Sequence, residues 1–174
     1  MGESDNKRQY ILSIREFRPE DIRQIRNLAR LAFESEVDRY WSVVGAQKAP
    51  YTYVAEIDGT IVGVIEFEPF YLPNSVEGHI WYIFVHPEYQ RRGIGTALLR
   101  KAEGILSREG AKRVWAITSP DNIKTQLFFE KNRYRRIPLD EMKKLLGSTS
   151  TKKFLRRMVY FEGDIIYVKV LYSY

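Results

Sequence analysis

The segment Ile83–Leu99, with the sequence IFVHPEYQRRGIGTALL, decides the predicted fold. It begins inside the apolar, β-branched run His79–Val85, which is typical of a strand buried on both faces of a sheet. The loop Gln90–Gly95 follows, and Thr96–Glu109 then carries apolar residues at helical spacing. Such a strand, loop and helix favour an anion, because the first N–H groups of the helix are free and its dipole attracts negative charge.

The composition of this loop predicts a particular class of phosphate compound. Gly93 and Gly95 let the backbone approach an anion closely, and Arg91 and Arg92 add cationic donors. The loop lacks the Lys-Ser/Thr ending of a P-loop and the three-glycine spacing of a dinucleotide fingerprint. We therefore expect a phosphate ligand different from those that these two motifs bind.

Hydrophobic periodicity and turn residues place the other elements. Strands are predicted at Tyr10–Phe17, Tyr51–Ile57, Thr60–Phe70 and Arg113–Thr118, with a C-terminal hairpin in Phe154–Tyr174 around Glu162–Asp164. Helices are predicted from Pro19, at Val37–Val44, at Asn122–Lys131 with Leu127 and Phe128 inward, and at Leu139–Leu146, with Gly147–Thr151 as a polar loop. This order indicates an α/β (α+β) domain with a mixed sheet.

Length and composition bound the class of protein. The chain has 174 residues, 44% of them hydrophobic, which favours one globular domain over residues 1–174, with a core at 10–137 and a C-terminal helix and hairpin at 138–174. It has no cysteine and only two histidines, so we expect no metal site. No apolar run is long enough to span a bilayer and Met1–Tyr10 is polar, so we expect a cytoplasmic protein without a membrane partner.

The charges are unevenly distributed along the chain. Residues 1–87 contain 9 basic and 13 acidic residues, whereas residues 88–174 contain 19 basic and 9 acidic residues. This asymmetry indicates a nucleic-acid surface, a site whose two halves meet opposite charges, or chance distribution over a solvated surface. Charge alone leaves all three interpretations open.

Two motifs carry a resemblance to a known family. The run Gln90-x-x-Gly93-x-Gly95 resembles the Q/R-x-x-G-x-G/A signature of the GNAT superfamily of acyl-CoA N-acyltransferases. The stretch Asn122–Tyr134 is similar to that superfamily's second motif, N-x-x-A-x-x-F-Y-E-K-x-G-F. The resemblance implies a three-layer domain with about seven strands and four or five helices, in which two parallel strands splay apart. It also implies an N-acetyltransferase that transfers the acetyl group of acetyl-CoA to an amine.

The resemblance also implies where acetyl-CoA binds. Backbone groups of the strand before the loop pair with the pantetheine arm, and a bulge in this strand exposes an N–H to the acetyl carbonyl. The loop N–H groups hold the pyrophosphate, and the asparagine of the second motif lies near the thiol. The residues so implied are Ile83, Phe84, Val85, Gln90, Arg91, Arg92, Gly93, Ile94, Gly95, Thr96, Asn122 and Phe129.

The proton-transfer groups remain open at this point. Many family members use a tyrosine as the acid, but this chain has Phe129 at that position, so Thr118, Ser119, Tyr82 or solvent must protonate the thiolate. The candidate bases are Glu66, Glu77 and His79: Glu66 lies with Glu68 on one face of its strand, and His79 has a suitable intrinsic pKa.

The acceptor is not identified by the sequence. In the superfamily it commonly meets the first two helices, which here carry Glu34, Glu36 and Asp38 and would suit a cationic amine. Tyr40 and Trp41 fit the apolar stripe of a helix, and we expect them in the core. A protein N-terminus, a lysine, a polyamine and a small amine all remain candidate acceptors, and a homodimer is an open alternative.

Two other functions compete with catalysis. Phe129 is also compatible with a catalytically degenerate CoA-binding sensor. The basic clusters Arg133–Arg136, Lys143–Lys144 and Lys152–Arg157 suggest a nucleic-acid-binding module, but no RNA-binding or helix-turn-helix signature accompanies them. We therefore do not expect a nucleic-acid partner, and the role of Lys152–Arg157 stays unexplained.

Overall fold

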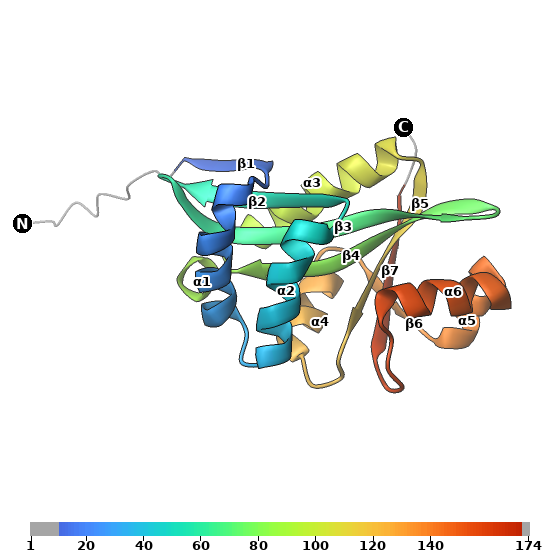
Figure 1. Cartoon of the computed structure of the whole chain (residues 1–174). Helices are drawn as coiled ribbons and strands as arrows, with labels where there is room; N and C mark the ends of the chain where they lie inside the picture. Colours follow the sequence, from blue (N-terminus) through green and yellow to red (C-terminus); the bar gives the residue numbers. More distant parts are fainter. Residues whose placement is uncertain (1–10, 172–174) are drawn as a thin grey trace, which may run out of the picture.

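A computed structural model describes residues 11–171 of the chain and contains one mixed sheet of seven strands in this range. The strand order is β1-β2-β3-β4-β5-β7-β6 (Figure 1). Only β4 and β5 are parallel; the other neighbours pair antiparallel. The strands are β1 Leu12–Glu16, β2 Tyr51–Ile57, β3 Thr60–Leu72, β4 Ser75–Val85, β5 Ala111–Thr118, β6 Arg135–Ile137 and β7 Ile165–Val170. The predicted fold class is confirmed.

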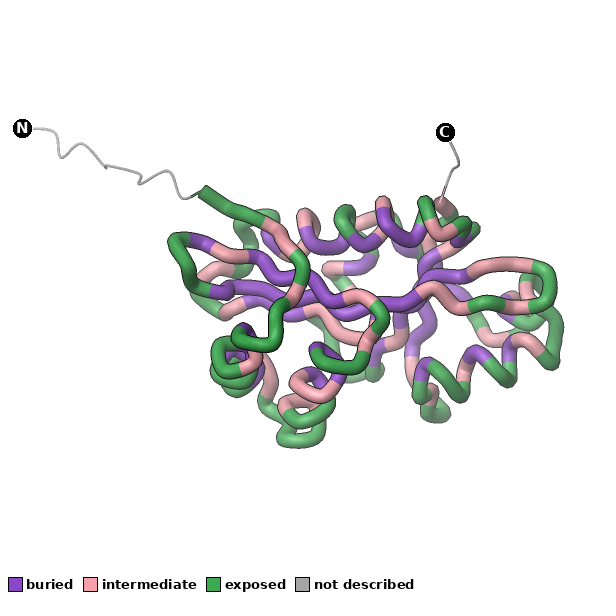
Figure 2. Tube along the Cα trace, turned by 45° about the horizontal axis from the view of Figure 1, so that its top comes forward, coloured by how far each residue is buried: buried purple, intermediate pink, exposed green. Residues whose placement is uncertain are grey.

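Helices cover both faces of the sheet. Helices α1 and α2 lie over β2 to β4 on one face, α5 and α6 lie further along the same face, and α3 covers the other (Figure 1). Figure 2 shows that buried residues are concentrated along the central strands and on the inner sides of the helices. The helices are α1 Ile22–Ala32, α2 Glu36–Lys48, α3 Ile94–Arg108, α4 Ile123–Lys131, α5 Leu139–Leu146 and α6 Ser148–Met158. Across residues 11–171, none has the length and apolar character required to cross a membrane.

Helix α3 forms where the apolar stripe predicts it. Its buried side chains recur at spacings of three and four residues and pack on β3 and β4, so the helix is held by its amphipathic face. Gly110, at φ +86°, follows its last turn in the left-handed conformation that glycine adopts without strain. The buried stripe consists of Leu98, Leu99, Ala102, Ile105 and Leu106.

The C-terminal part of the chain corrects two predictions. Residues 147–151 are not a polar loop, because Ser148 begins α6, and Phe154 lies in this helix rather than in a hairpin strand. Thr151, Phe154 and Met158 repeat at helical spacing and are buried, and this burial outweighs the polar character of the first turn. Strand β7 therefore pairs with β5 and with the unpredicted strand β6. Residues 172–174 of the predicted hairpin lie outside the described residues.

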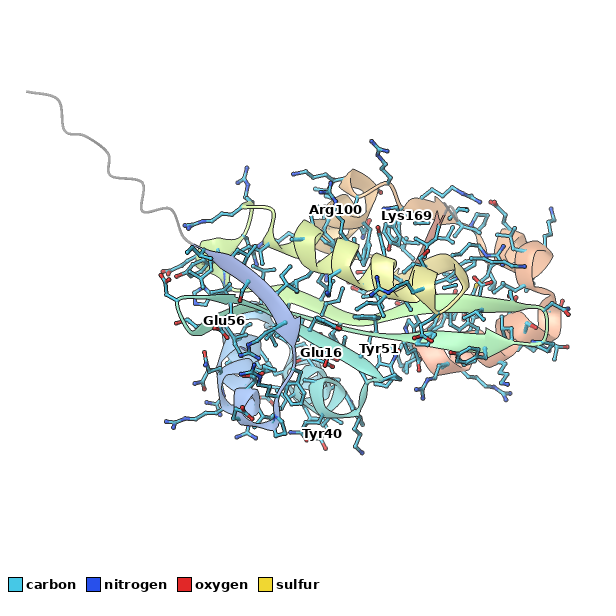
Figure 3. The ribbon with its side chains drawn as sticks, turned by 90° about the horizontal axis from the view of Figure 1, so that it is seen from above. Glu16, Tyr40, Tyr51, Glu56, Arg100 and Lys169 are labelled. Carbon is cyan, nitrogen blue, oxygen red and sulfur yellow. The ribbon has the colours of Figure 1, made fainter. Side chains whose placement is uncertain are left out.

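The prediction of which side chains face the core is also wrong at three helical positions. In α4, Leu127 is exposed and Phe129 is buried, so the inward face is displaced from the predicted one. In α2, Tyr40 is 62% and Trp41 is 53% exposed, so neither belongs to the core. Tyr40 lies on the side of α2 that points away from the sheet (Figure 3). The sheet-facing side of α2 consists instead of Ser42, Gly45 and Ala46.

Replacing Phe154 by alanine tests the helical docking of α6. The ring is completely buried and stacks on Phe70 at 4.8 Å, so Phe154→Ala should lower the free energy of unfolding by about 3–5 kcal/mol in urea titrations. The control is Phe161→Ala, because Phe161 is 69% exposed and its loss should cost about 0.5 kcal/mol or less. Equal effects of the two variants would contradict the position of α6.

Candidate active site

The parallel strands β4 and β5 separate halfway along their length. They are paired from Val76 and Ala111 as far as His79 and Trp115. Beyond that point, residues 80–85 of β4 pair only with β3, and residues 116–118 of β5 pair only with β7. The backbone N–H and C=O groups that face each other across this opening have no ladder partner, and apart from the Val85 carbonyl, which accepts a hydrogen bond from Gln90, they are free for a ligand. This is the splay that the resemblance implies.

A β-bulge lies at the same place in β4. Glu66 pairs with Tyr82 and Phe67 pairs with Ile80, so Trp81 is the extra residue. As a result, the consecutive residues Trp81 and Tyr82 both point to the face that carries α2 and α6. Residues 81–83 are partly exposed, although they lie in the middle of a central strand. The prediction that the whole strand is buried on both faces is therefore wrong at the bulge.

The loop after β4 is shaped to present backbone N–H groups. The side chain of Gln90 donates a hydrogen bond to the Val85 carbonyl at 3.0 Å and so ties the loop to the strand. Arg91 has φ +63° and Gly93 has φ +82°, which turns the chain sharply into α3. In the described part of the chain, no protein acceptor takes a hydrogen bond from the backbone N–H groups of residues 91–96. These N–H groups can therefore bind an anion, and they include those of the first helical turn, Ile94, Gly95 and Thr96.

The second motif is placed differently from the loop. Asn122 is the N-cap of α4, where its Oδ1 accepts the Thr125 N–H at 3.1 Å. Phe129 is buried, with its ring 5.1 Å from that of Tyr134 and 5.7 Å from that of Tyr167. Asn122 therefore stabilises the start of α4, and Phe129 contributes to the hydrophobic core, whether or not a ligand is bound.

Glu77 is fully engaged by other side chains. It is completely buried and accepts hydrogen bonds from Arg113 Nε at 2.9 Å and from Trp115 Nε1 at 2.7 Å, with a further ion pair to Arg113 Nη2. These donors use both carboxylate oxygens and join β4 to β5 just below the splay. The geometry argues against Glu77 as a base and for a structural role.

His79 belongs to a second buried cluster. Its Nδ1 lies 3.2 Å from Glu68, and Glu68 accepts two hydrogen bonds from Arg157 of α6, at 2.7 and 2.6 Å. Burial opposes the charge on Glu68, but the hydrogen bonds from His79 and Arg157 outweigh it and lower the pKa of Glu68 to about 2. Burial lowers the pKa of His79, which favours a neutral imidazole at physiological pH.

Glu66 is the exception among the buried carboxyl groups. It is 0% exposed, and neither of its oxygens has a hydrogen-bond partner in the described part of the chain. Its carboxyl group lies against Gly45 of α2, where the Cβ of any larger residue would overlap Oε2. Burial raises the pKa of Glu66 well above its ordinary value of 4.5. A buried, unpaired carboxyl group on the strand next to β4, opposite the bulge, marks a candidate functional group.

Sequence reasoning missed three contributors to this site. Arg157 was noticed only as part of an unexplained basic cluster, although it reaches β3. Gly45 carried a usable signal, since glycine inside a helix is unfavourable and often marks a close approach. Trp81 had no such signal, because a bulge depends on the register of the neighbouring strand.

The comparisons with known proteins agree with this geometry. A model of the acetyltransferase (GNAT) family matches residues 20–133. The chain belongs to the GNAT family. The splayed strands, the bulge and the loop before α3 all lie within the matched residues, so the resemblance seen in the sequence is confirmed.

Individual relatives of this GNAT chain extend the comparison. The acetyltransferase plu1384 of Photorhabdus laumondii is 34% identical over 84 residues, which cover 47% of this chain and 54% of that protein. The chain thus spans about half the length of the curated relatives it matches. A GNAT-family acetyltransferase from Staphylococcus aureus Mu50 superposes with a TM-score of 0.70 at 16% identity, covering 93% of this chain and 100% of the other. The PaiA N-acetyltransferase of Thermoplasma acidophilum, in complex with coenzyme A, superposes with a TM-score of 0.68 at 19% identity. This superposition covers 92% of this chain and 99% of the other.

The raised pKa of Glu66 makes a prediction about stability. Folded Glu66 keeps its proton at pH values where the unfolded chain releases it, so the wild-type protein loses about 1.4 kcal/mol of stability per pH unit between the two pKa values. Glu66→Gln removes this loss. In urea unfolding, the stability of the variant relative to wild type should be lowest near pH 4 and rise toward pH 8.

Glu77→Gln is the matched control for this measurement. Glu77 is equally buried but paired, so its replacement leaves Arg113 without its partner and should destabilise the protein by about 3–5 kcal/mol. The interpretation of Glu66 would be wrong if its variant were destabilised to a similar extent at pH 8.

Proposed function

We propose that this protein is an N-acetyltransferase that transfers the acetyl group of acetyl-CoA to an amine. One observation supports this most strongly: the bulge at Trp81 lies beside the point where β4 and β5 separate, and the anion-binding loop follows at the end of the same strand. A thioester could lie in the opening while its phosphates reach the loop. Family membership and the coenzyme A bound to the PaiA relative support the same ligand.

The described residues fit acetyl-CoA at both ends. The free N–H groups of residues 91–96 and the N-terminus of α3 suit the pyrophosphate, and Arg91 and Arg92 are exposed beside them. The unpaired edge of residues 80–85 suits the amide groups of the pantetheine arm, in the manner of an added strand. Acetyl-CoA, when bound, would supply an activated acyl group with a thiolate as leaving group.

The backbone at the bulge would assist the attack of the amine. A free N–H that points into the opening would stabilise the negative charge that develops on the carbonyl oxygen, a contribution of about 3 kcal/mol for each donor. The amine nitrogen forms a bond to the carbonyl carbon, the carbon–sulfur bond breaks, and the electron pair leaves with the sulfur. No charged side chain is required at the carbonyl.

Glu66 is the base that the geometry favours. It lies opposite Tyr82 on the neighbouring strand, whereas Glu77 is engaged by Arg113 and His79 by Glu68. A raised pKa brings a carboxylate closer to the working pH of a base. Because Glu66 is fully buried, we infer that the amine proton reaches it through a water molecule beside Tyr82.

No side chain is assigned as the acid. Phe129 has no proton to donate, and the Tyr82 hydroxyl donates to Asp38 at 3.2 Å. Thr118 is buried at the end of β5, and Ser119 is exposed after it. Since a thiol has a pKa near 8.5 on the cysteine scale, the thiolate is a tolerable leaving group and takes its proton from solvent.

Replacing Gly93 by aspartate tests the ligand site. In the wild-type protein, acetyl-CoA at about 100 times its dissociation constant should add about 2.7 kcal/mol of stability and raise the melting temperature. Gly93→Asp places bulk and negative charge at the loop and should abolish this shift. A variant that responds to acetyl-CoA like the wild type would refute the site.

The matched control is Gly110→Asp at the opposite end of α3. Gly110 has φ +86° and Gly93 has φ +82°, and an added Cβ meets no atom within 4 Å at either position. Both variants therefore carry the same backbone strain and charge. Only Gly110→Asp should keep the thermal shift.

The pH dependence of turnover tests the base. The rate of CoA release should rise with pH as Glu66 loses its proton, and Glu66→Gln should remove this rise and lower kcat by about 100-fold or more. Glu77→Gln and His79→Ala should retain it. Three unchanged profiles would assign proton removal to solvent or substrate, and absence of turnover with every amine would favour a CoA-binding sensor.

A further inference from the structure

The bulge directs two neighbouring side chains toward residues of opposite charge on two helices. Tyr82 donates a hydrogen bond to Asp38 of α2, and the ring of Trp81 lies under the guanidinium of Arg157 of α6, 4.9 Å from its centroid. Since Trp81 and Tyr82 are consecutive, these contacts belong to one small region of β4. Helices α2 and α6 lie on the same face of the sheet, on either side of this region (Figure 1).

Acidic side chains gather at the start of α2, the part of the helix that Tyr82 contacts, although α2 as a whole also carries Arg39 and Lys48. Glu34, Glu36 and Asp38 lie at the start of α2 or just before it, and none of the three has an ion-pair partner within residues 11–171. Glu66 lies behind Tyr82 under the same helix. This side attracts the positive charge of an amine.

The α6 side is basic and keeps unused donors. Helix α6 carries Lys152, Lys153, Arg156 and Arg157 and no acidic residue. Arg157 uses Nε and Nη2 for Glu68, whereas no acceptor in residues 11–171 takes a hydrogen bond from its Nη1, and its side chain is 44% exposed. Lys153, one turn earlier, has its Nζ 5.8 Å from the centroid of the Phe70 ring.

We propose that the acceptor carries a carboxylate as well as its reactive amine, and that Arg157 and Lys153 bind this carboxylate. The amine then lies on the Asp38 side of the bulge, next to the acetyl group. Glu68 holds the guanidinium of Arg157 in place, so its remaining edge is oriented before the substrate arrives. The acceptor class is an amino acid or a peptide whose amine and carboxylate lie close together. The inference rests on the proposed acetyltransferase function and assigns a role to the basic segment Lys152–Arg157.

Matched acceptors test this proposal. CoA release is measured for amino acids, for the corresponding amino acid amides and for the corresponding decarboxylated amines, with a short peptide and a polyamine as further acceptors. Because hydrogen bonds to charged groups are strong, the carboxylated compound should exceed its amide in kcat/KM by roughly 10- to 100-fold. An amide or a decarboxylated amine that is as good as the acid, or a polyamine as the best acceptor, would overturn the proposal.

Variants of α6 locate the carboxylate. Lys153→Gln should reduce the preference for acid over amide by about fivefold or more, through KM rather than kcat. Arg157→Lys keeps a positive charge beside Glu68 but loses the planar guanidinium with its several N–H donors. This variant should reduce the preference for acid over amide further. Lys152→Gln, at the adjacent exposed position, is the control and should leave the preference unchanged. Equal effects of the Lys152 and Lys153 variants would overturn the assignment.

Acetyl-CoA binding, measured by the thermal shift, and turnover, measured by CoA release, together separate this inference from the proposed function. A protein that binds acetyl-CoA and acetylates amines without preferring carboxylates refutes the inference alone. A protein that consumes no acceptor refutes the acetyltransferase function, and the inference with it.

Discussion

The separation of β4 from β5 after His79 is the feature on which the rest of the site depends. A central parallel strand normally bonds to a neighbour on each side, so half of the backbone groups in residues 80–85 lack the partners that a closed sheet would give them. The sheet tolerates this because β5 still pairs along its length with β7, and β4 with β3. The missing pairs leave a row of unpaired backbone N–H and C=O groups in the middle of the sheet.

Two side-chain clusters, each built on a buried carboxylate, join neighbouring elements at the closed end of this opening. Glu77 of β4 binds Arg113 and Trp115 of β5 where the strands are still paired. Glu68 of β3 joins His79 of β4 to Arg157 of α6 beside it. Removing one partner from a buried pair such as Glu77 and Arg113 costs several kcal/mol, so this cluster resists rearrangement of β4 against β5. Glu66 has no such partner, which explains why three neighbouring carboxyl groups on one face have different chemistry.

Sequence patterns predicted the parts of the fold that local periodicity determines. The strand, loop and helix of residues 83–99 were predicted because apolar period, glycine position and helix spacing agree there. Helix α6 was missed because Gly147 and the Ser/Thr residues after it resemble a loop until Phe154 and Met158 are seen to continue the stripe of Thr151. The exposure of Tyr40 and Trp41, the bulge and the reach of Arg157 to Glu68 depend on segments far apart in the chain. No local pattern encodes these contacts.

Phe129 stands where the family's second motif has a tyrosine, and it packs in the hydrophobic core. Its ring packs with Tyr134 and Tyr167, whose hydroxyl groups donate to Glu103 and Glu130. The two tyrosine hydroxyls are therefore already committed, and phenylalanine adds no polar atom that would need a partner in this buried cluster. A tyrosine at position 129 would bring a hydroxyl group into this buried cluster, and that hydroxyl would require a hydrogen-bond partner of its own. In the mechanism proposed above, the thiolate leaves without a proton donor, so phenylalanine at this position is compatible with catalysis, and the rate depends on the base and on the position of the amine.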